Sequence, residues 1–251
     1  MQERVYSSYN PLRYAVVAAT EDDHFWFRAR ARLVVWALRR YFPRARTFFE
    51  DGCGTGGMLR RVHEACPQMR LFGSDIFPEG LEIAARRVPQ ATLRCKADDP
   101  PPFDEPFDVV GAFDVLEHVD DDVAVLRQWR AAARPEGGVM LTVPQHPFLW
   151  SAADVTACHR RRYARSELLD KLRRAALAPV RVTSFASLLL PLLAASRLRP
   201  GGARQTELDL SPWLHRALGP VMALECALIR AGLDFPCGGS LLVVARSVAS
   251  A

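Results

Sequence analysis

TFFEDGCGTGG, residues Thr47–Gly57, is the stretch that decides the predicted fold. A short β-prone run, Thr47–Phe49, leads through Glu50 into a glycine loop, and the amphipathic pattern MLRRVHEAC follows at once. We therefore expect a strand, a loop and a helix, an arrangement that lets a ligand approach the backbone and meet unpaired helix N–H groups. The spacing excludes a P-loop, because no Gly-Lys-Ser/Thr follows, but it satisfies the dinucleotide pattern G-x-G-x-x-G. Glycine spacing alone leaves the ligand open.

Glu50 narrows the choice of ligand. A carboxylate just before the loop would repel a pyrophosphate but would suit a cationic ligand. With the glycines that follow, Glu50 resembles the first motif of class I S-adenosylmethionine (SAM) methyltransferases, whose ligand carries a sulfonium and an amino group. The resemblance implies SAM as cofactor, bound by Glu50, Gly52, Cys53, Gly54 and Gly56.

A second carboxylate, Asp75, stands at the position where nucleoside-binding sites commonly carry one. Arg70–Ser74 predicts a second strand that ends at Asp75, and Asp75 lies 25 positions beyond Glu50. A carboxylate at this point of a nucleotide-binding βαβ unit can accept hydrogen bonds from both ribose hydroxyls. Its alternative role is to cap the following helix. We expect the ribose role, with Ile76 beside it in the cofactor site.

The next segment resembles the part of these methyltransferases that contacts adenine. Ala91–Cys95 predicts a third strand, and an acidic loop with a proline cluster follows it. The resemblance implies that Asp98 accepts a hydrogen bond from the adenine amino group, with Asp99 beside it. The alternative is that both are exposed loop acids.

The centre of the chain carries the later motifs of the same family. Phe107–Phe113 is almost continuously apolar, as expected for a parallel strand that is buried on both faces. The sequences DVLEHV and RPEGGVMLTVP that follow are similar to those of the ubiquinone-type and related small-molecule methyltransferases. With the glycine loop and Asp75, ordered motifs cover residues 47–145, and the resemblance implies that Phe113 contacts the cofactor.

Two further segments resemble one branch of the family. Glu21–Tyr41 predicts a helix, and within its sequence HFWFRAR the resemblance implies that Trp26 and Arg30 cover the cofactor and pair with its carboxylate. The alternative is a docking helix with a solvated arginine face. HRRRY implies an acceptor pocket lined by His159, Arg162 and Tyr163, and its alternative is a solvated basic turn.

Alternating strands and helices without a repeat predict an α/β fold with a doubly wound, mostly parallel, seven-stranded sheet. We expect an N-terminal helical cap at 1–46, a SAM-binding core at 47–186, a helical insertion at 187–236 and the last strand within 237–251. The insertion holds two apolar segments around RPGGARQTELDLSP, too long for a turn. It predicts a lid, a dimer surface or a weak membrane contact, so the chain is expected to be a monomer or a homodimer.

Bulk composition points away from nucleic acid and from a membrane span. The net charge is +5, but Lys96 and Lys171 are the only lysines, and the arginine excess suggests a GC-rich bacterial genome. No basic stripe interleaved with aromatics appears, so we predict no nucleic-acid partner. Six cysteines without metal-ligand spacing, no secretory h-region and no apolar run long enough to span a bilayer predict a cytoplasmic protein.

The predicted reaction is methyl transfer to a small-molecule acceptor, on oxygen. Proximity of the acceptor to the sulfonium methyl carries much of the rate, and His118 or His146 is the expected base. Asp114, Glu117 and His118 stand at i, i+3 and i+4, so on a helical turn they would share one face. A divalent ion held by these three residues and His146 is an open alternative, but our prediction includes no metal. Two other functions stay open: a non-catalytic SAM-fold or partner-binding protein, and a Rossmann-type NAD or nucleotide-sugar enzyme, which conflicts with Glu50.

Overall fold

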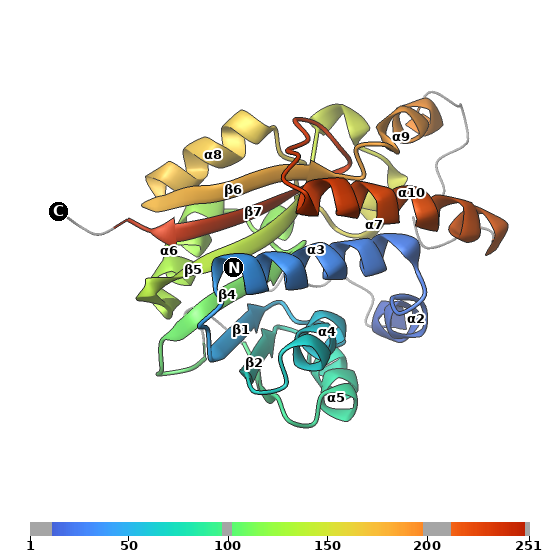
Figure 1. The fold of residues 1–251 in the computed structure, drawn as a ribbon. Helices are drawn as coiled ribbons and strands as arrows, with labels where there is room; N and C mark the ends of the chain where they lie inside the picture. The colour runs from blue at the N-terminus through green and yellow to red at the C-terminus, as the bar shows by residue number, and fades with distance from the viewer. Residues whose placement is uncertain (1–11, 97–101, 198–211, 249–251) are drawn as a thin grey trace.

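The computed structural model describes residues 12–96, 102–197 and 212–248, so the predicted adenine contacts Asp98 and Asp99 lie outside the described residues. One seven-stranded sheet has the strand order β3-β2-β1-β4-β5-β7-β6 (Figure 1). All neighbours pair in parallel except β7, which is antiparallel to both β5 and β6. The strands are β1 Thr47–Asp51, β2 Arg70–Asp75, β3 Thr92–Cys95, β4 Phe107–Phe113, β5 Ala133–Pro144, β6 Leu177–Phe185 and β7 Ser240–Ser247.

Helices alternate with the strands and cover both faces of the sheet. The helices are α2 Leu12–Thr20, α3 Phe25–Tyr41, α4 Gly57–Ala65, α5 Pro78–Arg87, α6 Asp122–Ala132, α7 Ala152–Thr156, α8 Arg165–Arg174, α9 Leu190–Arg197 and α10 Pro212–Arg230, with 3₁₀ turns η1 Leu116–His118 and η2 Pro147–Leu149. The α/β class and the mostly parallel seven-stranded sheet are confirmed.

Side-chain alternation along the strands builds two cores. Phe48 and Val109 point to the face covered by α3, α4 and α10, whereas Phe49 and Val110 point to the face covered by α6 and α8. Since parallel strands between two helical layers are buried on both sides, β1 and β4 need their nearly continuous apolar sequences. α3 and α10 lie side by side on one face (Figure 1).

Several predicted boundaries move. The helix predicted from Glu21 begins at Phe25, because His24 has extended backbone angles and its side chain accepts a hydrogen bond from the Trp26 amide. The segment before it, where no element was predicted, contains α2. The predicted turn at 134–138 belongs to β5 as an irregularity in its pairing with β4.

The described part of the inserted segment contains two helices. The two apolar stretches form α9 and α10, and α10 packs on α3. Within the described ranges, no helix is both long enough and apolar enough to cross a membrane.

Candidate active site

A cavity of about 1350 Å³ opens at the edge of the sheet where β1, β2 and β4 end. The glycine loop and Asp75 line one end, and residues of η1 and the segment around His159 line the other. Side chains of α2, α3, α9 and α10 cover it. Ligands of open α/β sheets bind at the carboxyl ends of the strands, and the cavity lies at that edge.

The glycine loop has the backbone conformation that only glycine adopts readily. Gly52, Gly54 and Gly56 have φ angles of 73°, 51° and 74°. A Cβ on Gly52 would lie 2.5 Å from Cγ2 of Val115, so that position excludes a side chain for steric reasons as well. Gly52, Gly54 and Cys53 line the cavity, whereas Gly56 caps α4 and packs against Ala84, outside the lining.

Asp75 holds the loop in place. Its carboxylate accepts hydrogen bonds from the amides of Gly54 (2.8 Å) and Phe77 (2.9 Å) and from the Tyr14 hydroxyl (3.2 Å). Burial raises its pKa, and these hydrogen bonds act in the opposite direction. Tyr14 of α2 is a contact that sequence reasoning missed, because nothing local in its sequence marks it.

Glu50 is buried and incompletely satisfied. Its Oε2 atom has no hydrogen-bond partner among the described residues. Burial raises its pKa well above the usual range, and the charge of Arg30 partly opposes that rise. The neighbouring Asp51 differs, because its carboxylate is satisfied by Lys96 (3.0 Å), by the Trp129 indole N–H (2.7 Å) and by Ser74 (2.8 Å). Glu50 is therefore the carboxylate of this pair with capacity for a ligand.

Trp26 and Arg30 of α3 both line the cavity. The Arg30 guanidinium lies 4.8 Å from the centre of the Trp26 ring and forms an ion pair with Asp114. Asp114 has a φ of 59° and precedes η1, so it does not share a helical face with Glu117 and His118. The expectation of a common face is corrected. Ile76 and Phe113, two other predicted cofactor contacts, also line the cavity.

Charged groups of the α2–α3 connection fasten this helical cover to the core. Glu21 and Asp22 form ion pairs with Arg87 of α5, and Asp22 also pairs with Arg60 of α4. Glu21 accepts a further hydrogen bond of 2.6 Å from Thr55 in the glycine loop. The cover over the cofactor end is thus held by electrostatic contacts.

At the other end of the cavity, η1 meets the HRRRY segment. Glu117, His118, His159 and Arg162 all line the cavity. Asp154 orients two of them, with 2.9 Å to His159 Nδ1 and a 2.8 Å hydrogen bond from Arg162 Nε. Burial alone would raise the pKa of Asp154, but these hydrogen bonds hold it at about 2. Asp154 was missed, although an acid shortly before a His-Arg-rich run is a usable signal.

Two predicted residues lie elsewhere. Tyr163 is fully buried in the core, where its hydroxyl donates to Leu116 O (3.0 Å) and contacts Asp122 Oδ2 (3.1 Å), so it does not line the cavity. His146 also lies outside the lining, and burial together with the Arg162 charge lowers its pKa. Of the three residues predicted from the HRRRY segment, His159 and Arg162 line the cavity and Tyr163 does not. His118 is the predicted base that lines the cavity.

Comparison with known sequences agrees with this geometry. Residues 49–139 match a family model described as a methyltransferase domain. A curated relative, ubiquinone biosynthesis O-methyltransferase from Cereibacter sphaeroides, is 32% identical over 155 residues. That alignment covers 51% of this chain and 59% of the relative.

Solved structures share the fold across almost the whole chain. A chain in the complex between the Haloferax volcanii Trm112 methyltransferase activator and its putative methyltransferase has a TM-score of 0.62 at 18% identity, covering 96% of both chains. The plantazolicin methyltransferase BpumL in complex with S-adenosylhomocysteine (SAH) has a TM-score of 0.59 at 13% identity, covering 98% of this chain and 90% of that one. By these matches, residues 49–139 are similar to a methyltransferase domain, and the chain shares its fold with the two solved structures.

Proposed function

We propose that this protein transfers the methyl group of SAM to an oxygen atom of a small-molecule acceptor. The observation that carries the proposal is the set of groups at one end of the cavity: the glycine loop with its positive φ angles, Asp75, and Glu50 with one carboxylate oxygen that lacks a hydrogen-bond partner among the described residues. A cationic ligand would supply Glu50 with the charge and donors that it lacks. The relative's name, an O-methyltransferase, supports oxygen as the acceptor atom.

Each lining group has a separate task in binding SAM. Asp75 would accept from the ribose hydroxyls, in place of or beside the Tyr14 hydroxyl that donates to Oδ1. Arg30 would donate to the carboxylate of the cofactor's amino-acid part, while the Trp26 ring covers it. Glu50 would face the positive charge, and Asp98 and Asp99, outside the described residues, remain predicted adenine contacts.

Methyl transfer then requires one covalent exchange. The acceptor oxygen attacks the methyl carbon in line with the departing sulfur, the carbon–sulfur bond breaks with its electron pair leaving on sulfur, and SAH and a methylated oxygen result. The acceptor's proton must leave, and His118 and His159 are the imidazoles that line the acceptor end. Holding the two reactants in line supplies a large share of the rate.

The helical insertion gives the acceptor end an apolar cover. Leu192 and Leu193 of α9 and Leu214 and Leu218 of α10 line the cavity. Apolar walls with a few polar groups are typical of sites for small organic ligands. We therefore propose that α9 and α10 form a lid over an acceptor with a substantial apolar part.

Calorimetry with SAM, SAH and NAD on the full chain tests the cofactor assignment. We expect SAM and SAH to bind and NAD not to bind. Asp75→Ala should weaken SAM binding by about 1.5–3 kcal/mol, because a charge-assisted hydrogen bond is lost. Asp170→Ala, on the exposed face of α8, is the matched control and should change nothing. Unchanged SAM affinity in the Asp75 variant would remove Asp75 from the site.

Turnover is tested separately, by mass spectrometry of a metabolite extract incubated with the protein and methyl-labelled SAM. We expect one product that carries the label on oxygen. SAM binding without any labelled product would favour the non-catalytic alternative.

A further inference from the structure

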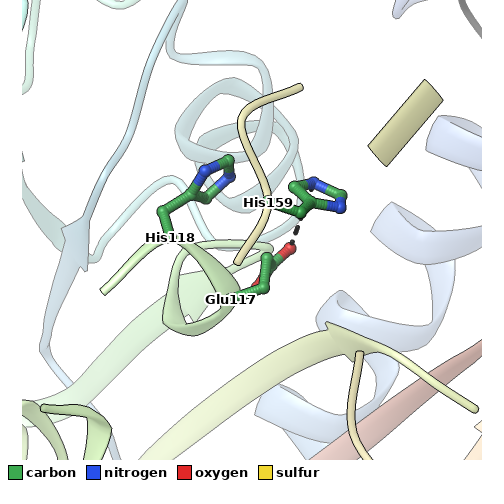
Figure 2. A group of neighbouring side chains, drawn as sticks. All are labelled: Glu117, His118 and His159. Carbon is green, nitrogen blue, oxygen red and sulfur yellow. Dashed lines mark ion pairs between the residues drawn. The ribbon is translucent and has the colours of Figure 1, made fainter. Parts of the chain in front are cut away.

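Glu117, His118 and His159 bring three potential metal ligands together at the acceptor end of the cavity (Figure 2). One ligand atom from each lies within 4.8 Å of the other two. Glu117 and His118 come from η1, and His159 comes from the segment that follows α7. This set differs from the one considered from the sequence, because Asp114 pairs with Arg30 and His146 does not line the cavity.

The two imidazoles are oriented as metal ligands usually are. His159 Nδ1 lies 2.9 Å from the carboxylate of Asp154, and His118 Nδ1 lies 3.3 Å from the carbonyl oxygen of Cys158. Both partners are acceptors, so each Nδ1 carries the proton and each Nε2 presents its lone pair. Histidine ligands of metals typically have their second nitrogen hydrogen-bonded to a carboxylate or a backbone carbonyl in this way.

Glu117 supplies an independent observation. Its side chain is 0% exposed, and neither carboxylate oxygen has a hydrogen-bond partner among the described residues. The nearest cationic candidate is His159, with 3.8 Å between Nε2 and Oε1. A buried carboxylate without a partner is costly, and a bound cation removes that cost.

The surrounding charges leave room for a cation. Two arginines whose charges act on Glu117, Arg30 and Arg162, form ion pairs with Asp114 and Asp154. Each arginine is thus offset by a carboxylate of its own. The charge of Glu117 is the one that these pairs do not offset.

We propose that Glu117, His118 and His159 bind a divalent transition-metal ion. Two imidazoles and one carboxylate are donors that suit Zn²⁺, Fe²⁺ and related ions, and three protein ligands leave positions open. Ligand atoms about 2.0–2.1 Å from one ion lie roughly 3–3.4 Å apart, so a modest closing movement completes the site. The role of the ion rests on the proposed function. The open coordination positions would bind the acceptor's oxygen, and the ion would favour the deprotonated form of that oxygen.

The test measures metal binding on the full chain after treatment with a chelator and dialysis. Calorimetry with Zn²⁺ should give one ion per chain, and Co²⁺ should give a visible absorption band from bound imidazole. Glu117→Gln and His159→Gln should each weaken Zn²⁺ binding by about 100-fold or more, and Asp154→Asn by about 10–100-fold, through loss of the histidine's orientation. His146→Gln and His63→Gln are matched controls, since neither residue lines the cavity, and both should bind Zn²⁺ as the unmodified chain does.

SAM binding of every variant, measured in the same buffer, separates the two proposals and shows that each variant is folded. Zn²⁺ affinity that is weak, or unchanged by Glu117→Gln and His159→Gln, overturns the metal site. If SAM still binds in that case, the proposed function stands, and His118 and His159 act as bases without an ion. Zn²⁺ binding in a chain that does not bind SAM would instead support the metal site and contradict the proposed function.

Discussion

The two ends of the cavity are built in different ways. At the cofactor end, hydrogen bonds donated by the backbone hold the glycine loop. The Gly52 and Cys53 amides donate to Ser74 O, and the Gly54 amide donates to Asp75. At the acceptor end, side chains from distant segments meet, and Asp154 orients His159 and Arg162 beside the buried Glu117. The cofactor end therefore depends on local conformation, whereas the acceptor end depends on tertiary packing and on charge.

A change to the backbone of the glycine loop is expected to have the largest effect on stability. Gly52→Ala places a side chain at a φ of 73° and 2.5 Å from Val115 Cγ2. We expect a loss of about 2–5 kcal/mol in the free energy of unfolding, from backbone strain and overpacking. Denaturant unfolding measures it. Gly219→Ala in α10, where a Cβ meets nothing within 4 Å, should be neutral or should stabilise the chain by up to about 1 kcal/mol. Equal effects of the two substitutions would contradict a steric role for Gly52.

Acid should weaken the acceptor end through Asp154. Its folded-state pKa of about 2 lies below the ordinary value of 3.8, so its contribution to stability is present above about pH 4. That contribution, about 2 kcal/mol, is lost as the pH falls from about 4 to 2. The free energy of unfolding against pH, compared with Asp154→Asn, gives the measurement. The asparagine variant should lack this part of the acid loss, and parallel curves for both proteins would count against the assignment.

The variant Tyr163→Phe tests whether Tyr163 stabilises the core or lines the acceptor pocket. Tyr163→Phe removes a hydroxyl that bonds Leu116 O and Asp122, so stability should fall by about 1–2 kcal/mol. SAM affinity and the acceptor's KM should stay unchanged, because the side chain is outside the cavity. A raised KM with unchanged stability would return Tyr163 to the acceptor pocket that the sequence motif implied.

The smallest effect is expected at Tyr14. Tyr14→Phe removes the hydroxyl that donates to Asp75 Oδ1, an atom proposed to bind ribose. SAM should then bind equally well or a few-fold more tightly, a gain of less than about 1 kcal/mol. Calorimetry should compare the SAM affinity of Tyr14→Phe with that of Asp75→Ala. A large loss of SAM affinity in Tyr14→Phe would show that the hydroxyl contacts the cofactor directly.

The sequence predicted the sheet and the positions of the glycine loop and Asp75 well, because these depend on short-range patterns. β4 was predicted with its observed bounds, Phe107–Phe113, since a central strand is apolar throughout. The glycine loop and Asp75 follow β1 and β2 directly, so parallel pairing places them at one edge.

The acceptor end was predicted less well, for reasons that particular residues show. Asp114 was expected on a helical face, but its positive φ takes it out of register with Glu117 and directs it to Arg30. His146 follows a strand that ends at the correct edge, yet its side chain lies outside the cavity. Neither outcome is set by neighbours in the sequence, since each depends on which segment packs alongside.

The ion pairs of Glu21 and Asp22 make the cover over the cofactor end sensitive to ionic strength. At physiological salt, charges more than about 8 Å apart at a surface are largely screened, and the half-exposed pair of Asp22 with Arg60 is screened more than the nearly buried pair of Glu21 with Arg87. Raising the salt concentration should therefore loosen α2 and the start of α3 before it affects the sheet. Exchange of the cofactor would then become faster in concentrated salt, while the fold below keeps its stability.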